Sequence, residues 1–351
     1  MTGVATLAVV DPVDDTAWDQ LVRQHPFGTV FHSPPWLRAL QDTYGFRFRA
    51  NLALDGEGRP RAGLVHSRIE DPLGSRVLSL PFSDFCDPLV DEPATWQALT
   101  RDLLTEADRV QLRCLHNEIP RADERFELLD RAVWHRVDLR GTHEEAWDRL
   151  DASARRAIRR ARDAGLRVVE ARSEGDLRQF FELHLQVRKH KYRLLAQPYR
   201  FFLALWDEFV GAGDGTLLLA RRDADVVGGV FFLGWGDTLY YKFNASDPQH
   251  LGVRPNDLVV WEAMAMARER GYRFLDFGLS AWEQEGLQRF KRKYATEERD
   301  IALLRHTATA PGAHVAETRR LLELFTGLAV GDRTPDHVTE AAGNVLYRYF
   351  A

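Results

Sequence analysis

The sequence predicts a mixed α/β fold, in which strands and helices alternate along the whole chain. Its 351 residues are 45% hydrophobic and 28% charged, which is typical of a globular protein long enough for two domains. Some segments alternate apolar and polar residues, whereas others repeat apolar residues at helical spacing. Residues 258–267, LVVWEAMAMA, are apolar nearly all round and lie between two strand-like segments. This pattern predicts a buried helix within a β–α–β unit.

The first part of the chain contains both kinds of element. We expect its strands at residues 6–10, 47–54, 61–69, 75–80, 109–115 and 131–139. We expect its helices at residues 15–25, 34–44 and 93–107.

The second part begins with three helices and continues with strands. The helices are expected at 153–165, 174–192 and 198–213, with a strand at 215–222 and others at 225–235 and 237–246. A loop at 247–257 leads into the apolar helix at 258–271, and a strand follows at 272–278. The loop holds Gly252 and Arg254, and the helix begins near Pro255. Free backbone N–H groups at such a helix start predict an anion-binding site.

The composition argues against several classes of protein. No apolar run approaches the roughly 20 residues that a bilayer crossing needs, so we expect no membrane span. The N-terminal segment has no Lys or Arg before its short apolar run, which argues against a secretory signal. Cys86 and Cys114 form no CxxC pattern, and two reduced, buried thiols indicate a cytoplasmic protein. The twelve histidines are scattered, so we expect no metal site.

A net charge of −5 and a pI near 6 argue against a protein that coats nucleic acid, and we expect no DNA partner. A local basic segment nevertheless exists, because residues 154–167 contain six arginines. Arg155, Arg159 and Arg162 form one stripe of the expected helix, opposite an apolar stripe. This stripe is either an ordinary solvated face or a surface that binds phosphate.

Residues 285–295, EGLQRFKRKYA, combine an apolar stripe with a cluster of cations. Leu287, Phe290 and Tyr294 recur at helical spacing, and Lys291 directly follows Phe290. Ordinary solvation accounts for the neighbouring cations, but Lys291 could be aimed at a negative group. In the preceding strand, Asp276 falls in a buried position and is either a hydrogen-bonded structural carboxylate or a catalytic one.

The order of these segments resembles that of Fem-like transferases of the GNAT superfamily, which include the peptidoglycan-bridge peptidyltransferases. The resemblance rests on YYKFNASDP, RPNDLVVWEAMAMARERGYRFLDFG and EGLQRFKRKYA, with FHSPPWLRALQDTYGF and LPFSDFCDPLV upstream. It covers about residues 25–305. It implies tandem GNAT-like domains, each a splayed mixed sheet flanked by helices, with residues 237–246 and 272–278 as the splayed strands of the second domain. The expected domains are 1–140 and 141–309, with helices in 310–351 packing back on the first.

The resemblance also implies site residues. Phe290 and Lys291 match a Phe-Lys pair close to the reaction centre, where the lysine pairs with donor phosphate or with the tetrahedral intermediate. Asp87 matches the region where carboxylates contact the acceptor or act as a base, and Asp84 is a rival for that role. We also expect substrate contacts from residues of the cleft and of the basic segments, namely Tyr241, Lys242, Arg155, Arg159 and Arg188.

GNAT-type chemistry is attack by a primary amine on an activated acyl group. Coenzyme A enzymes of this kind hold pyrophosphate in a loop of pattern [QR]xxGx[GA]; here Gln249 and Gly252 match, but Arg254 replaces the final small residue. This departure favours aminoacyl-tRNA as the donor, and Arg254 could bind phosphate itself through its guanidinium fork.

Three hypotheses follow from the resemblance and the donor loop. The first is an aminoacyltransferase that forms an amide between the aminoacyl group of charged tRNA and an amine of a peptide, cell-wall precursor or small metabolite. The second is an acetyl-CoA or acyl-CoA dependent N-acyltransferase, and the third is a non-catalytic protein that binds a phosphorylated ligand. No cofactor beyond the donor itself is implied.

Overall fold

The structure is a computed structural model that describes residues 6–309 and 312–351. Within these ranges, twelve strands form one mixed sheet in the order β1-β2-β3-β4-β5-β12-β6-β11-β10-β9-β8-β7. The strands of the first half of the chain are β1 (Thr6–Val10), β2 (Phe48–Leu54), β3 (Pro60–Asp71), β4 (Gly74–Leu78), β5 (Arg109–Cys114) and β6 (Glu127–Asp138). Those of the second half are β7 (Arg167–Glu170), β8 (Gly215–Arg222), β9 (Asp225–Trp235), β10 (Thr238–Ser246), β11 (Phe274–Ala281) and β12 (Glu297–Thr307). The expected mixed α/β class is confirmed.

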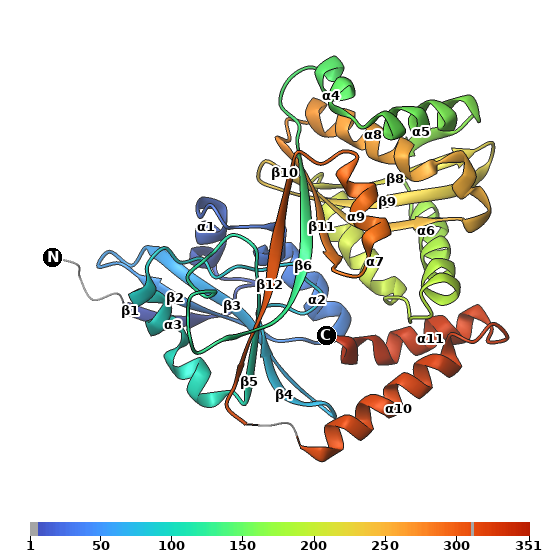
Figure 1. The fold of residues 1–351 in the computed structure, drawn as a ribbon. Coiled ribbons are helices and arrows are strands. Elements are labelled where there is room, and N and C mark those ends of the chain that lie inside the picture. The colour runs from blue at the N-terminus through green and yellow to red at the C-terminus, as the bar shows by residue number, and fades with distance from the viewer. Residues whose placement is uncertain (1–5, 310–311) are drawn as a thin grey trace.

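Helices cover both faces of this sheet. The α-helices are α1 (Thr16–Gln24), α2 (Pro34–Tyr44), α3 (Pro93–Glu106), α4 (His143–Arg149), α5 (Ala152–Asp163), α6 (Glu174–Gln186), α7 (Tyr199–Leu205), α8 (Pro255–Glu269), α9 (Glu285–Arg292), α10 (Ala313–Ala329) and α11 (Asp336–Leu346). Short 3-10 segments are η1 (Val30–His32), η4 (Pro248–Val253) and η5 (Tyr347–Phe350), and π-helical turns η2 (Val187–Lys191) and η3 (Trp206–Val210) extend α6 and α7. In Figure 1, α5 and α8 lie on one face of the second-half strands, and α6 and α7 lie on the other.

Strand β12 joins the two halves of the sheet, because it pairs with β5 on one side and β6 on the other. In Figure 1, β12 and β6 run side by side through the middle of the molecule, although about 160 residues separate them in the sequence. Strand β12 was not expected from the sequence. Its first residues, Glu297 to Asp300, are charged and hide the apolar alternation that follows.

One hydrophobic core spans both halves. It contains Trp18, Trp36 and Leu40 from the first half together with Phe180 and Phe231 from the second. A second cluster packs α5 and α8 against β8–β11, and a third packs α3 against β3–β5. The shared core fixes the two halves relative to each other, so a cavity between them has a defined shape.

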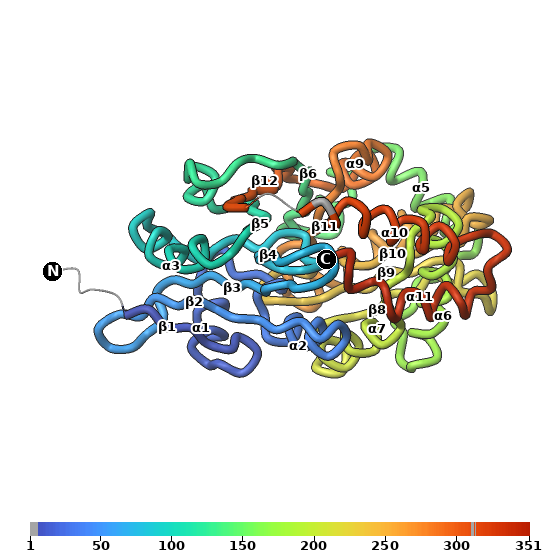
Figure 2. The backbone as a smooth tube through the Cα atoms, turned by 90° about the horizontal axis from the view of Figure 1, so that it is seen from below, coloured from blue at the N-terminus to red at the C-terminus, as the bar shows by residue number. Residues whose placement is uncertain are grey.

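The C-terminal helices contact both halves (Figure 2). Glu340 of α11 pairs with Arg178 of α6, whereas Tyr347 stacks on Tyr44, which ends α2. The expected division at residues 140 and 310 stays a prediction, and residues 310–311 lie outside the described ranges. Of the helices in the two described ranges, none has the length and apolarity needed to cross a bilayer.

Candidate active site

Strands β10 and β11 part from each other after a short parallel contact. They pair only from Thr238 to Tyr240 on β10, opposite Phe274 to Asp276 on β11, although both strands continue well beyond. Parallel strands that separate in this way leave backbone and side chains facing an open wedge. The resemblance to Fem-like transferases implied that these two segments diverge, and this expectation is confirmed.

A cavity of about 740 Å³ lies at this wedge and is lined by residues of both halves. On the first-half side, it reaches the point where β4 and β5 part after pairing at Val77 and Leu78. The cavity therefore connects two places at which parallel strands separate, one in each half of the chain. Its size is that of a site for a ligand of small-molecule dimensions.

Lys291 projects from α9 into this cavity. Its ammonium donates hydrogen bonds to the carbonyl oxygens of Gly278 (3.1 Å) and Leu279 (3.0 Å) on β11, and the residue is only 2% exposed. Burial lowers the pKa of the Lys291 ammonium to about 8, an effect that the negative charges of Asp84 and Asp276 oppose. Lys291 is thus a buried cation that remains mostly charged at neutral pH.

Asp84 of the first half forms an ion pair with Lys242 of β10. Lys242 Nζ lies 2.6 Å from Oδ1 of Asp84 and also donates to the carbonyl oxygen of Phe82 at 3.2 Å. Lys242 is the extra residue of a β-bulge, because Tyr241 and Phe243 pair with consecutive residues of β9. A bulge redirects the side chain of its extra residue, and here that side chain lines the cavity.

Gly278 of β11 makes room for the same carboxylate. A Cβ at Gly278 would lie 2.1 Å from Oδ2 of Asp84, and the residue has a φ of +61° that glycine adopts without strain. It lies in a second bulge, since Phe277 and Gly278 together face one residue of β6. Asp84 is therefore held between Lys242 on one splayed strand and Gly278 on the other.

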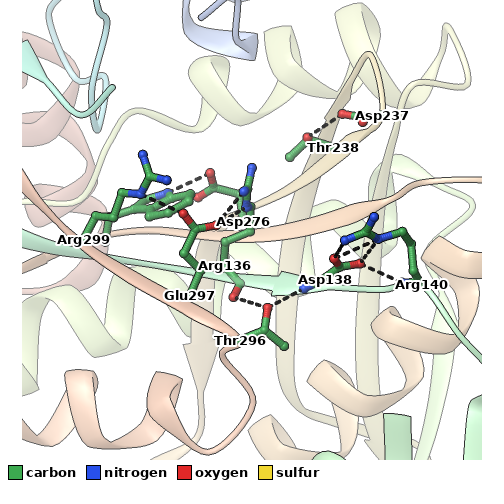
Figure 3. A network of polar contacts seen from close by, with 10 residues as sticks. Arg136, Asp138, Arg140, Asp237, Thr238, Asp276, Thr296, Glu297 and Arg299 are labelled. Carbon is green, nitrogen blue, oxygen red and sulfur yellow. Dashed lines mark hydrogen bonds and ion pairs between the residues drawn. The ribbon is translucent and has the colours of Figure 1, made fainter. Parts of the chain in front are cut away.

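Asp276 lies on the opposite face of β11, where it lines a separate cavity of about 600 Å³. Its oxygens accept hydrogen bonds from Trp134 Nε1 (2.8 Å) and from the N–H of Gly278 (2.6 Å). Figure 3 shows the carboxylate beside Arg136, which pairs with Glu297. Burial raises the pKa of the Asp276 carboxyl to about 7, and the two hydrogen bonds limit that rise. A carboxyl group with this pKa can exchange a proton near neutral pH.

Lysine is rare in this chain, where only five of the 47 cationic residues are lysines. Two of the five, Lys242 and Lys291, line the same cavity. An ammonium is a compact point charge whose pKa responds to burial, whereas a guanidinium stays charged and needs a planar partner. The pairing of two lysines at one buried location suits a role in stabilising developing negative charge.

A smaller pocket of about 310 Å³ lies at the N-terminus of α8. Arg254, Arg289, Phe290 and Lys293 line it, so three cations surround the start of a long helix. Arg254 caps the helix in a left-handed conformation with φ +64°. This is the conformation that a small residue would adopt most easily at that position of the loop.

Other residues singled out from the sequence lie elsewhere or have partners of their own. Asp87 is 1% exposed, and its oxygens accept N–H groups of Leu115, His116 and Asn117 at 2.8–3.1 Å. It lies outside the lining of the 740 Å³ cavity. Arg155 donates to the carbonyl oxygens of Trp147 and Asp148, and Arg159 lies over the ring of Trp147, so both are on the outer side of α5. The structure therefore separates these three residues from Lys291.

Tyr241 and Arg188 do line the cavity. Tyr241 packs edge to face with Phe232 and Phe277, and burial raises the pKa of its hydroxyl. Arg188 donates to the carbonyl oxygen of Leu195 at 2.9 Å. The structure thus brings Lys291, Asp84, Lys242, Tyr241 and Arg188 to one cavity and places Asp276 behind it.

Comparison with known proteins agrees with this geometry. A family model described as an acetyltransferase (GNAT) domain matches residues 149–292, the part of the chain that contains both splayed strands and Lys291. This part of the chain is therefore similar to a GNAT domain. Its α8 and α9 carry the pocket at the helix start and the buried lysine, respectively. No curated protein matches the sequence.

Solved structures show a similar fold over most of the chain. FemX matches with a TM-score of 0.67 at 14% identity, covering 90% of this chain and 100% of FemX. A tandem GNAT protein from the clavulanic acid biosynthesis pathway matches with a TM-score of 0.54 at 12% identity, covering 88% of this chain and 100% of that protein. L-PGS from Bacillus licheniformis matches with a TM-score of 0.53 at 14% identity, covering 90% of this chain and 97% of L-PGS. The resemblance to Fem-like proteins is confirmed at the level of the fold.

Some residues of the site were missed in the sequence. Arg113 donates to the carbonyl oxygen of Ser83 and Trp36 Nε1 donates to its hydroxyl, so both fix the loop that carries Asp84. No local pattern signals these long-range contacts. Gly278 did carry a signal, because a glycine inside a strand indicates a bulge or a close backbone approach.

Proposed function

We propose that this protein is an N-acyltransferase that moves an aminoacyl group from aminoacyl-tRNA to an acceptor amine and forms an amide. One observation carries the proposal: Lys291 and the Asp84–Lys242 pair meet where β10 and β11 separate, inside a cavity shared by both halves. The GNAT domain supports acyl transfer in general. The aminoacyl donor is the more specific part of the proposal.

The charges of the site suit this reaction. The acceptor nitrogen must be neutral to attack the ester carbonyl, and the buried ammonium of Lys291 disfavours a second positive charge beside it. As the C–N bond forms, negative charge develops on the carbonyl oxygen, which Lys291 would stabilise. The ester C–O bond then breaks and the ribose oxygen takes up a proton.

A carboxylate is needed to accept the proton that the amine loses. Asp84 lines the reaction cavity and Asp276 lies behind β11 with a pKa of about 7. Asp84 is the residue in reach of a substrate in the cavity. Asp276, in this proposal, holds Gly278 and Trp134 in place and tunes the charge around Lys291.

The pocket at the start of α8 supports a phosphate-bearing donor. Arg254, Arg289 and Lys293 give it three cations. In coenzyme A enzymes, a small final loop residue lets backbone N–H groups approach pyrophosphate, and the side chain of Arg254 would crowd that approach. Arg254 therefore favours the phosphates of a tRNA acceptor end over coenzyme A.

An acyl-CoA donor is the second candidate. The family model that matches residues 149–292 is that of acetyltransferases, and this is the observation that favours it. The acceptor chemistry would be the same, with a thiolate as the leaving group. The two candidate donors predict opposite effects of replacing Arg254 on donor binding.

A donor-binding experiment separates them. Charged tRNA and acetyl-CoA are titrated separately onto the protein and onto Arg254→Gly, which restores the small residue of the coenzyme A loop. The tRNA hypothesis predicts salt-sensitive binding of charged tRNA that weakens in Arg254→Gly. Tight acetyl-CoA binding that strengthens in Arg254→Gly, without a response to tRNA, would contradict it.

The matched control is Arg193→Gly. Arg193 also has a positive φ, of 55°, and pairs at the surface with Asp332. Its replacement relieves the same kind of backbone strain without touching the pocket. Equal effects of both substitutions on donor binding would indicate a change in general charge or stability, and would remove the support for a phosphate contact at Arg254.

A further inference from the structure

A third β-bulge turns Leu129 into the reaction cavity. On β6, Leu128 pairs with Leu304 and Asp130 pairs with Leu303, so Leu129 is an extra residue without a partner on β12. Consecutive residues of a regular strand point to opposite faces, yet residues 129–132 all line the cavity. The bulge therefore places a leucine, 42% exposed, at the rim of the cavity.

The first-half side of the cavity continues this apolar surface. Its walls come from the end of β4 and the segment after it, and from β12 and η5, which pack against these first-half elements. They include Leu78, Leu80, Phe82, Leu303, Leu304 and Phe350. Phe350 is 43% exposed and lines the same cavity as Leu129. Large apolar side chains left in contact with water around a cavity mark a surface that binds an apolar group.

The cations on this side already have partners. Arg113 donates to the carbonyl oxygen of Ser83, and Arg131 pairs with Asp300 at 3.3 Å. By contrast, the pocket at the start of α8 presents the guanidinium groups of Arg254 and Arg289 beside Lys293, which pairs with Asp257 at 3.3 Å. Phosphate thus has a site on the second-half side, whereas the first-half side offers leucine and phenylalanine.

We propose that the acceptor is a primary amine attached to an apolar body, and that this body binds between Leu129, Leu303 and Phe350. The inference rests on the proposed acyl transfer and names the class of its acceptor. The amine would lie near Asp84 and Lys291 while an alkyl or aromatic group extends along the first-half wall toward the rim. A nucleotide-linked acceptor would leave its phosphates facing this leucine-rich wall, where their desolvation is costly.

The test uses n-alkylamines from propylamine to octylamine as probes. Their binding to the full-length protein is measured by calorimetric titration without any acyl donor. Each added methylene should tighten binding about fourfold until the chain reaches the rim. Leu129→Asp should weaken octylamine binding about tenfold and leave propylamine binding nearly unchanged.

Leu128→Asp is the matched control, because Leu128 is the preceding residue, is 49% exposed and does not line the cavity. It should leave octylamine binding unchanged. Affinity that does not depend on chain length, or an equal loss in both variants, would overturn the inference.

The donor-free design also separates this inference from the proposed function. If alkylamines bind as predicted but no donor acylates them, the acyl-transfer proposal fails and the apolar site stands. If the protein acylates small polar amines while chain length has no effect on binding, acyl transfer stands and the apolar acceptor is excluded.

Discussion

Asp84 and Gly278 lie in direct contact across the two halves of the chain. A Cβ on Gly278 would come within 2.1 Å of Oδ2 of Asp84, while Oδ1 pairs with Lys242 at 2.6 Å. The absence of a side chain at position 278 is thus what lets a first-half carboxylate enter the wedge between two second-half strands. The central charges of the site depend on this one glycine.

Replacement of Gly278 should therefore displace Asp84. We expect Gly278→Ala to reduce acyl transfer about 100-fold, because the new methyl group pushes the carboxylate from its position beside Lys242. Steady-state kinetics measures this effect. Gly165→Ala is the control: Gly165 also has a positive φ, of 78°, but has no atom within 4 Å of its Cβ position. A similar loss in both variants would show that backbone strain, and not Asp84, is responsible.

Lys291 should matter for activity far more than for stability. Lys291→Met should lower the rate of acyl transfer about 100- to 1000-fold, because the developing oxyanion loses its cation. The free energy of unfolding should change by less than about 2 kcal/mol, since removal of a buried charge offsets the loss of two hydrogen bonds. Rates and urea denaturation of the same samples check both parts.

The neighbouring Arg292→Met is the comparison for Lys291→Met. Arg292 is exposed and pairs with Glu298 at the surface. Its replacement should change neither the rate nor the stability by much. Loss of activity in Arg292→Met equal to that in Lys291→Met would contradict a specific role for the buried ammonium.

Asp276 should make stability depend on pH. Its pKa in the folded protein, about 7, lies above its ordinary value of about 4. Between these values the native state holds a proton that the unfolded chain has released, so the free energy of unfolding falls as pH rises. Asp276→Asn lacks this effect. The free energy of unfolding of Asp276→Asn, taken relative to that of wild type, should therefore rise by about 2–3 kcal/mol between pH 5 and pH 8 in urea titrations. A constant difference between the two proteins would show that Asp276 is ionised throughout.

Asp87 should act through stability alone. Its carboxylate accepts the N–H groups of Leu115, His116 and Asn117, which fixes the chain after β5. Asp87→Asn should lower the free energy of unfolding by about 1–3 kcal/mol and leave the turnover of folded protein unchanged. Asp84→Asn should instead lower the turnover of the folded protein and leave the free energy of unfolding nearly unchanged. A loss of turnover in Asp87→Asn without destabilisation would return Asp87 to the list of catalytic candidates.

Periodicity predicted most of the fold. The apolar runs of α8, β8 and β9 and the partly alternating residues of β10 specify their elements locally. Strand β12 was missed because Glu297 to Asp300 look like a surface loop. Its strand conformation depends on pairing with β5 and β6, which are more than 150 residues away in sequence.

The site was predictable only in part. The Phe290–Lys291 pair and the strand containing Asp276 could be picked from the sequence, and Lys291 does line the cavity. The sequence placed Asp87 ahead of its rival Asp84, whereas the cavity is lined by Asp84; both lie in an irregular segment three residues apart, which has no periodicity to show where each side chain points. The bulges at Lys242 and Leu129 also have no local signal, since they arise from register with β9 and β12.

Amide formation in a single turnover tests both the aminoacyl donor and the role of Lys291. Excess protein is mixed with labelled aminoacyl-tRNA or labelled acetyl-CoA and a panel of primary amines, with Lys291→Met and Arg292→Met in parallel. We expect a labelled amide from charged tRNA, formed at similar rates by wild type and Arg292→Met and far more slowly by Lys291→Met. Amide from acetyl-CoA alone would contradict the tRNA donor. No amide from either donor, or equal rates in the two variants, would contradict acyl transfer at Lys291.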